Sequence, residues 1–555
     1  MLNITPEIRL KNTTERQNRA AEPRISAWVS ANAGSGKTYV LVKRVIRILL
    51  SGTEPHKILC LTFTKTAAAE MQNRLFEILS NWAVMDDAPL IAEINKIAAT
   101  NLSAEQLPIA RKLFAEALET PGGLKIQTVH AFCERILHTF PIEAGISPQF
   151  EVIDDRSSRE MLGDIKRSVL TEAQNLNGKF GNSMVIISQH ANENKFDELL
   201  NGLIKNRQKI SKLIGYDFTD IQLSSAPLGM AIGKLGNVLK ISDLLQAADI
   251  AGQDVARYYL DILADKSLWP LSDLRKMLDI LKEAGGITNL KFAAHIDRAL
   301  SAKNVEIATE AYFDIFMTKD RKPVKAWFSK KIQNEYTDIY ENLVDAKVVI
   351  VKKYEKLKAV KLYQASTALF EIGNAILWQF VQEKQSRNMV DYDDLINITA
   401  KLLNGKSHKH KGQTAWVLYK LDNGLDHILI DEAQDTSPEQ WAVIEPLVQE
   451  ITAGEGARDA QRSLFVVGDE KQSIYKFQGA NRAVFKSKEI AFERSFKNAK
   501  MNWEHIGLDL SFRSAPCILE AVDRVFNFAN AASGVYDDAV ENIKNGEINV
   551  RHFAN

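Results

Sequence analysis

The sequence predicts an α/β protein whose parallel sheet is interrupted along the chain by a large helical segment. Near the start of the chain and again after residue 425, apolar runs alternate with helical runs at the spacing of β–α units. Between about 155 and 388, apolar residues instead recur at helical spacing, as in FDELLNGLIKNRQKISKLI. A turn of small residues between one apolar run and the next helix adds a place where phosphate could bind.

Length and composition indicate a folded protein with more than one domain. The chain has 555 residues, of which 45% are hydrophobic and 25% are charged. Its 70 basic and 70 acidic residues give a net charge of +0. That balance argues against a protein that coats nucleic acid non-specifically, but it is compatible with a local basic groove.

Nothing in the sequence predicts export or membrane insertion. The first residues carry early charges and no apolar signal-peptide core, and no apolar run approaches the length of a membrane span. The three cysteines, Cys60, Cys133 and Cys517, are far apart and lack the spacing of a metal or redox pair. We expect them to be reduced core residues of a cytoplasmic protein.

Seven strands are predicted from apolar runs. They cover residues 24–31, 57–63, 124–129, 149–154, 426–431, 463–469 and 506–512. Helices should follow the first three of these strands, at TYVLVKRVIRILL, TAAAEMQNRLFEIL and HAFCERILHTF. After the fifth strand, Ser437 is expected to cap a helix whose first residue is Pro438.

The segment ANAGSGKT has the pattern of a P-loop, because it lies between a predicted strand and a predicted helix. Small residues let backbone N–H groups surround a phosphate, and the helix N-terminus adds positive potential. Lys37 should reach the β- and γ-phosphates of ATP, and the Thr38 hydroxyl should hold Mg²⁺. The alternative is a glycine-rich turn that binds nothing, and Ala31 does replace a glycine of the strict pattern. The expected ATP-binding residues of this segment are Ala31, Asn32, Ala33, Gly34, Ser35, Gly36, Lys37 and Thr38.

Two adjacent carboxylates follow the predicted strand at 426–431, in the segment ILIDEAQDT. Asp431 is expected to hold the magnesium directly or through water. Glu432 is expected to orient and deprotonate the attacking water. A solvated acidic turn is the alternative, but a buried strand that delivers both groups favours the catalytic interpretation.

Seven segments, in this order, resemble the motifs of superfamily 1A helicases of the UvrD, Rep and PcrA type. They are SANAGSGKT, LTFTKTAAAEM, IQTVHAFCERIL, VDYDDLI, LIDEAQDT, VVGDEKQSIYKFQGA and LDLSFRS. Within this family the chain looks like the AddA type, the helicase–nuclease subunits of AddAB repair complexes. The Lys-Thr pair in TFTKTAA, Phe477 with Gln478 in KFQGA, and the long gap from Asp155 to Asn388 favour AddA over a UvrD type. A helicase of the RecB type is the alternative within the family.

The resemblance implies roles for four further residues around ATP. Gln17 resembles the glutamine that reads adenine, and Phe512 the aromatic that stacks on it. Arg513 resembles the arginine that stabilises charge on the γ-phosphate in the transition state. Gln472 resembles the γ-phosphate sensor.

The resemblance also implies a path for single-stranded DNA. Phe63, Thr128 and His130 lie at positions where the family touches the strand. Tyr475 and Phe477 lie where the family stacks bases, an interaction worth ~1–3 kcal/mol per base. Simple core packing is the alternative for these two aromatics.

Three weaker patterns are also present. KDRKPVKAWFSKK (319–331) is basic with Trp327 and Phe328 interleaved, and GKSHKHKG (405–412) is basic and loop-like. Either could lie on DNA phosphates or be a solvated face. VDYDDLI (390–396) has three carboxylates, but the resemblance makes it a helicase motif, and we assign it no metal.

The resemblance implies a P-loop NTPase fold with a RecA-like parallel sheet, a large helical insertion and a second RecA-like lobe that has only begun. We expect the first lobe at 1–155 and 389–505, the insertion at 156–388, and the start of the second lobe at 506–555. The chain stops about forty residues past Arg513. We therefore expect the N-terminal half of an AddA-like protein with a poorly packed C-terminal segment.

The implied function is an ATP-dependent DNA helicase of 3′ to 5′ polarity that acts in double-strand-break repair and recombination. Its cofactors would be ATP and Mg²⁺. Its partners would be an AddB-like protein, single-stranded DNA and double-stranded DNA. A module that binds ATP and single-stranded DNA without acting as a motor is the alternative, because the motifs of the second lobe are missing.

Overall fold

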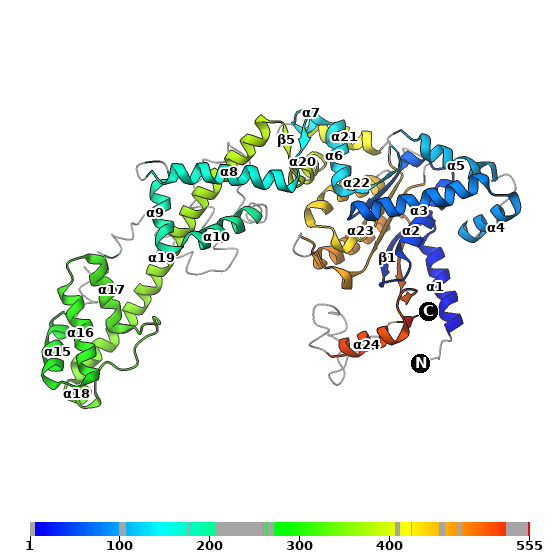
Figure 1. Ribbon diagram of the computed structural model, residues 1–555. Coiled ribbons are helices and arrows are strands. Elements are labelled where there is room, and N and C mark those ends of the chain that lie inside the picture. The colour runs from blue at the N-terminus through cyan, green and yellow to red at the C-terminus, as the bar shows by residue number, and fades with distance from the viewer. Residues whose placement is uncertain are drawn as a thin grey trace. The chain divides into compact units, whose positions relative to one another are not determined.

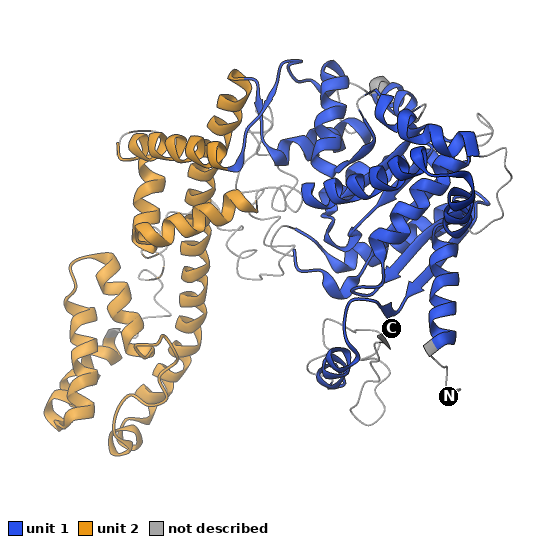
Figure 2. Ribbon diagram, turned by 45° about the vertical axis from the view of Figure 1, so that its right-hand side comes forward, with its two compact units in different colours: residues 1–155, 388–555 blue, residues 156–387 orange. Residues whose placement is uncertain are grey.

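The chain folds into two compact units, which are described separately (Figure 2). Unit 1 comprises residues 1–155 and 388–555, and unit 2 comprises residues 156–387. The structure is a computed structural model. It describes residues 6–98, 107–121, 123–175, 178, 180–206, 259, 262, 271–405, 411–422, 424–453, 461–475, 479–528 and 553–554.

Unit 1 is built on a six-stranded sheet in the order β3-β2-β6-β7-β1-β8. Figure 1 labels its strand β1 and shows helices around the sheet. Every pairing between neighbouring strands is parallel. The strands are β1 (Ser26–Ala31), β2 (Ile58–Thr62), β3 (Lys125–Thr128), β6 (His427–Ile430), β7 (Ser463–Gly468) and β8 (Trp503–Leu508). The parallel α/β architecture predicted from the sequence is therefore confirmed.

Side chains alternate between the two faces of this sheet, and helices cover both. In β1, Ala27 and Val29 point into one apolar cluster and Trp28 into the other. The first cluster is closed by α2 (Lys37–Leu50), α3 (Lys65–Val84), α4 (Asp87–Ala98) and α5 (Leu107–Glu119). The second is closed by α6 (Val129–Thr139), α20 (Tyr392–Leu403), α21 (Lys411–Asp422), α22 (Pro438–Ala453) and α23 (Arg482–Asn498).

One predicted strand lies outside the main sheet. The segment expected to be a strand at 149–154 contributes only β4 (Glu151–Val152), which pairs with β5 (Met389–Val390). Hydrogen bonds from Glu151 N to Asn388 O (2.9 Å) and from Ile153 N to Val390 O (3.0 Å) extend this ribbon. It forms where the chain leaves unit 1 and returns to it.

The strand expected to open a second lobe at 506 instead belongs to the six-stranded sheet. β8 pairs with the whole length of β1, from Ser26–Trp503 to Ala31–Leu508. A bare edge of β1 would leave backbone groups unpaired, and β8 satisfies them. Beyond it, β9 (Leu510–Ser511) pairs with β10 (Phe553–Ala554). Helix α24 (Pro516–Phe526) buries none of its residues, in agreement with the poor packing expected there.

Unit 2 is helical in the part that the structure describes. Its helices are α8 (Asp155–Ala173), α9 (Gly181–His190), α10 (Glu193–Lys205), α15 (Leu271–Ala284), α16 (Ile287–Ser301), α17 (Val305–Phe316), α18 (Lys330–Glu335) and α19 (Thr337–Ser386). Helix α19 has 50 residues. Its first half packs into one apolar cluster with α15, α16 and α17, and its second half packs into another with α8, α9 and α10.

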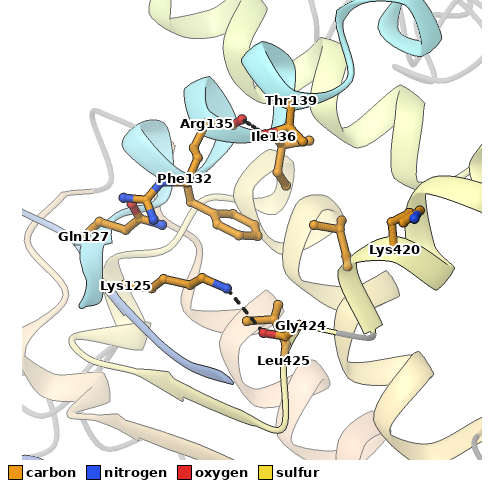
Figure 3. A pocket seen from close by; sticks show the side chains of 10 residues that line it. Lys125, Gln127, Phe132, Arg135, Ile136, Thr139, Lys420, Gly424 and Leu425 are labelled. Carbon is orange, nitrogen blue, oxygen red and sulfur yellow. Dashed lines mark hydrogen bonds between the residues drawn. The ribbon is translucent and has the colours of Figure 1, made fainter. Parts of the chain in front are cut away.

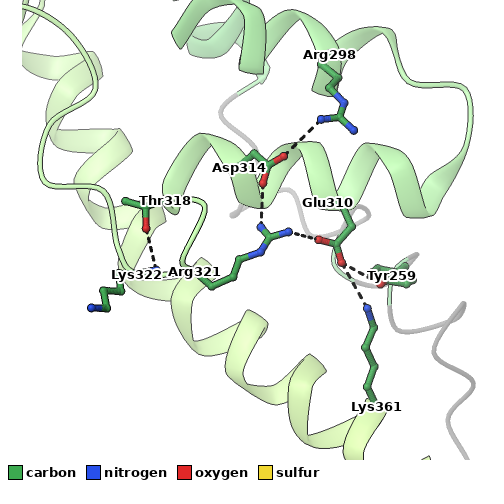
Figure 4. A network of polar contacts seen from close by, with 8 residues as sticks. All are labelled: Tyr259, Arg298, Glu310, Asp314, Thr318, Arg321, Lys322 and Lys361. Carbon is green, nitrogen blue, oxygen red and sulfur yellow. Dashed lines mark hydrogen bonds and ion pairs between the residues drawn. The ribbon is translucent and has the colours of Figure 1, made fainter. Parts of the chain in front are cut away.

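The two aromatic rings of the basic segment at 319–331 are core residues of unit 2, whereas its lysines are exposed. Trp327 and Phe328 are 2% and 3% exposed, and Trp327 Nε1 donates to Ile315 O at 2.9 Å. Arg321 pairs with Glu310 and Asp314 of α17 (Figure 4). The apolar faces of the two rings thus close the core of unit 2.

Further features follow from the described residues. None of the described helices is long and apolar enough to cross a membrane. Cys60 and Cys133 are buried as expected, whereas Cys517 is exposed on α24 and is not a core residue. The remaining helices of unit 1 are α1 (Pro6–Ala20) and α7 (Pro141–Ala144).

Candidate nucleotide site

The predicted P-loop connects the end of β1 to the start of α2. Gly34 and Gly36 have φ of +75° and +88°, a backbone conformation that residues with a Cβ rarely adopt. Ser35 N donates to Asn32 O at 3.2 Å and closes the turn. Lys37 is the first residue of α2 and Thr38 the second, so both lie at the positive end of the helix dipole.

Gln17 lies against this turn. From helix α1, its Nε2 donates to Ser35 O at 3.0 Å, and its side chain is buried. Two arginines of α2 hold the C-terminal end of α1 in place. Arg44 Nη1 donates to Ala20 O and Arg47 Nη1 donates to Asn18 O, each at 2.8 Å. The structure thus brings Gln17 to the turn at residues 31–38, and its role at adenine stays a prediction.

The two carboxylates after β6 face the P-loop. Lys37 Nζ lies 2.7 Å from Glu432 Oε2. Glu432 has φ of +48°, a strained conformation for a residue other than glycine. Its position is fixed by hydrogen bonds from Asp431 N to Leu61 O (2.9 Å) and from Glu432 N to Asp431 Oδ1 (3.0 Å). Strain of this kind persists where the surroundings enforce it, and here it turns Glu432 toward Lys37.

Asp431 is 7% exposed, and its charge is poorly compensated by the protein alone. Burial and then the charge of Glu432 raise the pKa of Asp431 to about 6, while Lys37 opposes the shift. The Asp431 carboxylate and the half-buried Thr38 hydroxyl are oxygen ligands of the kind that Mg²⁺ prefers, and a bound cation would favour the charged form of the carboxylate.

Two residues that the sequence analysis missed link this site to Gln472. Gln434 Nε2 donates to Glu432 Oε2 at 2.7 Å, and Gln434 Oε1 accepts from Asp469 N at 2.9 Å. Asp469 Oδ2 then accepts from Gln472 Nε2 at 2.7 Å. A continuous chain of contacts therefore runs from Lys37 to Gln472. Gln434 lies within the acidic segment ILIDEAQDT, whereas its partner Asp469 follows a different strand, β7.

Asp435 is a third residue that was missed. Burial and then the charge of Glu432 raise its pKa to about 6. Its Oδ2 accepts from Gln434 Nε2 at 3.2 Å, while its Oδ1 is buried without a hydrogen-bond partner among the described residues. Three carboxylates, on Asp431, Glu432 and Asp435, therefore crowd one side of the P-loop lysine.

The segment after β8 also reaches the P-loop. Phe512 N donates to Gly34 O at 2.8 Å, and Asn32 N donates to Leu508 O at 3.0 Å. A methyl group built on Gly34 would lie 2.6 Å from Arg513 Cβ. The side chains of Phe512 and Arg513 are exposed, so both are free to meet a ligand. Ala33 is likewise exposed at the tip of the turn.

Residues expected to contact DNA gather at the carboxyl ends of β2, β3 and β7. The rings of Phe63 and Tyr475 lie 4.6 Å apart, and each is half-buried. Tyr475 follows the short turn η5 (Glu470–Gln472), which contains Gln472. Phe477 lies outside the described residues.

Thr128 and His130 have local partners. Thr128 is buried and caps α6, because its Oγ1 accepts from Ala131 N at 3.3 Å. The ring of His130 lies 5.5 Å from that of Tyr392, edge to face. Burial lowers the pKa of His130, which favours its neutral ring. The Thr128 hydroxyl thus has a structural role at the position where a DNA contact is expected.

Two other sequence features form helix caps. Asp391 and Asp394 form a capping box at the start of α20. Ser437 caps α22 as predicted: its Oγ accepts from Gln440 N at 3.2 Å, and Gln440 Oε1 accepts from Ser437 N at 3.0 Å. Residues 406–410 of the basic segment 405–412 lie outside the described residues.

Known proteins resemble most of this chain. A family model described as the UvrD/REP helicase N-terminal domain matches residues 12–493. Three similar proteins are each named as an A-type subunit of an ATP-dependent helicase/nuclease. They come from Pediococcus pentosaceus (24% identical over 90% of this chain), Listeria monocytogenes serotype 4a (25% over 95%) and Latilactobacillus sakei subsp. sakei (27% over 90%). This chain spans 37%, 40% and 53% of their respective lengths. With most of its length matched by the family model, the chain belongs to the UvrD/REP helicase family.

Proposed function

We propose that this chain is the ATP-hydrolysing, DNA-contacting part of an AddA-type DNA helicase. One observation carries the proposal. The contacts from Lys37 through Glu432, Gln434 and Asp469 to Gln472 join the P-loop to the turn that leads to Tyr475. A site that only bound nucleotide would not need this connection to an aromatic pair at the DNA-facing end of the sheet.

Each residue at the nucleotide has a distinct task in this proposal. Lys37 leaves Glu432 and binds the β- and γ-phosphates, so that Glu432 becomes free to accept a proton from the attacking water. Thr38 and Asp431 hold Mg²⁺, which neutralises charge on the phosphate oxygens when it is bound. Arg513 adds positive charge to the γ-phosphate, and Gln17 and Phe512 hold the adenine.

The coupling to DNA runs through one short turn. Gln472 lies at the end of η5 and Tyr475 three residues later, so a shift of Gln472 toward a γ-phosphate moves the platform made by Tyr475 and Phe63. Bases of single-stranded DNA stack on aromatic rings without sequence preference. Thr128 and His130 extend the same path, and the family resemblance implies that Phe477 also stacks a base.

The remaining parts of the proposal come from the family. We propose that the six-stranded sheet is a RecA-like lobe, that residues 156–388 are its helical insertion, and that the motor moves 3′ to 5′. The relatives are named as parts of a helicase/nuclease, so we also propose an AddB-like partner and a role in double-strand-break repair. Double-stranded DNA is then the natural substrate.

The decisive experiment measures ATP turnover of this chain with and without a single-stranded dT oligonucleotide, beside Lys37→Ala. Lys37→Ala removes the phosphate-binding cation and should abolish turnover. The matched control is Lys57→Ala, because the Lys57 side chain pairs with the exposed residue Glu54 before β2. If the chain is part of a helicase, single-stranded DNA should stimulate ATP turnover at least tenfold in both the parent chain and Lys57→Ala.

The same measurement tests the alternative of a non-motor module. Nucleotide binding that depends on Lys37, together with turnover that DNA does not stimulate, would assign the chain to binding alone. Tyr475→Ala adds an independent readout, since losing one stacked ring should weaken dT binding about tenfold.

A further inference from the structure

A pocket of about 160 Å³ lies between β3, α6 and α21, at the edge of the six-stranded sheet (Figure 3). Its floor is apolar and is made by Phe132, Ile136, Leu421 and Leu425. Phe132, Ile136 and Leu425 are almost completely buried, so the floor is a continuation of the unit 1 core. A space of this size and lining suits one bulky apolar side chain.

The walls of the pocket are basic. Lys125, Arg135 and Lys420 line it, and none of the described lining residues is acidic. Within the described part of the chain, no carboxylate lies within ion-pair distance of these three cations. Lys125 Nζ donates to Gly424 O at 3.2 Å, and Lys420 Nζ lies 4.6 Å from the ring of Trp416. Their charge is therefore available to an anionic ligand.

Gln127 adds a second, independent sign of a ligand. It lines the pocket and is 8% exposed, and its Nε2 has no hydrogen-bond partner among the described residues. A buried donor without a partner costs about 1–3 kcal/mol. Burial, and then the charge of Arg135, lower the pKa of Lys125, which an incoming anion would reverse. An anion in the pocket would therefore stabilise the Lys125 charge, and the unpartnered Gln127 amide belongs to the same wall.

The pocket lies away from the nucleotide site. Lys125 is the first residue of β3 and Leu425 precedes β6, so the pocket is at the amino ends of the strands. Lys37, Glu432 and the residues expected to contact DNA lie at the carboxyl ends. On the outer face of α21, the exposed rings of Trp416 and Tyr419 stack 6.3 Å apart. A partner could therefore dock here while ATP and DNA are bound.

We propose that this pocket docks an acidic peptide segment of a partner protein, with one bulky apolar side chain on the floor and flanking carboxylates on Lys125, Arg135 and Lys420. A nucleic-acid strand fits less well. Its phosphates would gain nothing from the apolar floor, and backbone binding uses open basic grooves. A peptide that carries both features uses the floor and the walls together.

The test measures fluorescence anisotropy with a labelled acetyl-Asp-Glu-Asp-Leu-Phe-Asp-Glu-amide peptide. Two control peptides have the same length. One replaces each Asp with Asn and each Glu with Gln, and the other replaces the Leu-Phe pair with Ser-Ser. Only the first peptide should bind, and Arg135→Glu should weaken it at least tenfold. The control is Lys497→Glu, a charge reversal at an exposed residue of α23 that should leave affinity unchanged.

Three outcomes would overturn the proposal: no binding of the acidic apolar peptide, equal binding of all three peptides, or unchanged binding by Arg135→Glu. If a dT oligonucleotide instead competed with the peptide and lost its own binding in Arg135→Glu, that result would assign the pocket to nucleic acid. Should Arg135→Glu unfold in a thermal melt, the exposed Lys420→Glu replaces it. ATP turnover of these variants should match the parent chain, which separates this docking site from the proposed motor.

Discussion

Lys37 Nζ and Glu432 Oε2 lie 2.7 Å apart, so the P-loop cation and the acidic residue after β6 form an ion pair. The Lys37 side chain is only 11% exposed, which strengthens the attraction relative to a surface pair. Nucleotide phosphates and Glu432 compete for the same ammonium group. We therefore expect phosphate binding to release Glu432 and to expose its carboxylate for proton transfer.

The first prediction is that Glu432→Gln separates binding from turnover. Gln keeps an oxygen that can accept from Lys37, but it cannot take a proton from water. ATP affinity should be equal or higher, because the competing charge is gone, while turnover should fall by ~10²–10⁴. A fluorescent ATP analogue reports affinity and phosphate release reports turnover. Glu116→Gln, at an exposed residue of α5, is the matched control. Parallel loss of both properties would mean that Glu432 serves mainly to hold the P-loop.

The second prediction concerns pH and Asp431. Its pKa is raised from 3.8 in the unfolded chain to about 6 in the folded chain. The folded state therefore holds the proton more tightly, and this contribution to stability is present below pH 4 and is lost as pH rises through 6. Asp431→Asn removes the buried charge and keeps the oxygen that accepts from Glu432 N. It should raise the free energy of unfolding at pH 8 by ~1–3 kcal/mol, and the gain should shrink toward pH 5.

Thermal melts at pH 5 and pH 8, without nucleotide, measure this difference. Mg²⁺ should narrow the gap at pH 8, because a bound cation stabilises the charged carboxylate of the parent chain only. A variant that is less stable than the parent at pH 8 would show that the Asp431 charge is compensated by the protein itself.

The sequence could predict the glycine-rich turn between β1 and α2 and the strand that ends before Asp431 and Glu432, because each depends on local spacing. Gln434 and Asp469 could not be found in this way. Their contact exists because β6 and β7 are neighbours in the sheet, although the residues are far apart along the chain. Trp327 shows a second limit of sequence patterns. A basic segment with aromatic residues has the same pattern whether the rings face DNA or the core, and here they face the core.

The third prediction tests the contact through Gln434. A methyl group on Gly468 would lie 2.6 Å from Gln434 Oε1 and 3.1 Å from the ring of Phe485. Gly468→Ala should therefore displace the amide that links Glu432 to Asp469. We expect about a tenfold loss of DNA-stimulated turnover and a loss of stability of ~1–3 kcal/mol. Turnover assays and thermal melts measure the two effects.

The matched control is Gly507→Ala, in β8 of the same sheet. A methyl group there finds its nearest neighbour, Asp509 Oδ1, at 3.6 Å, which is an ordinary contact. This variant should keep normal turnover. If Gly468→Ala and Gly507→Ala lost turnover equally, the Gln434 contact would not be the cause.

The fourth prediction separates backbone strain from close approach in the P-loop. Gly34 and Gly52 both have positive φ, +75° and +91°, so an alanine at either position is strained by ~1 kcal/mol. The two positions differ in their surroundings. A methyl group on Gly34 would lie 2.6 Å from Arg513 Cβ and 2.7 Å from Ser511 Oγ, whereas one on Gly52 meets no described atom within 4 Å.

Gly52→Ala should consequently lower the melting temperature slightly and leave ATP affinity unchanged. Gly34→Ala should push the segment carrying Phe512 and Arg513 away from the P-loop and weaken ATP binding at least tenfold. Titration with the fluorescent ATP analogue, beside thermal melts of both variants, measures the difference. Equal ATP affinity in the two variants would mean that the segment after β8 contributes nothing to the nucleotide site, and that Arg513 acts elsewhere. Because the backbone strain is matched, the affinity difference reports the contact between the P-loop and this segment.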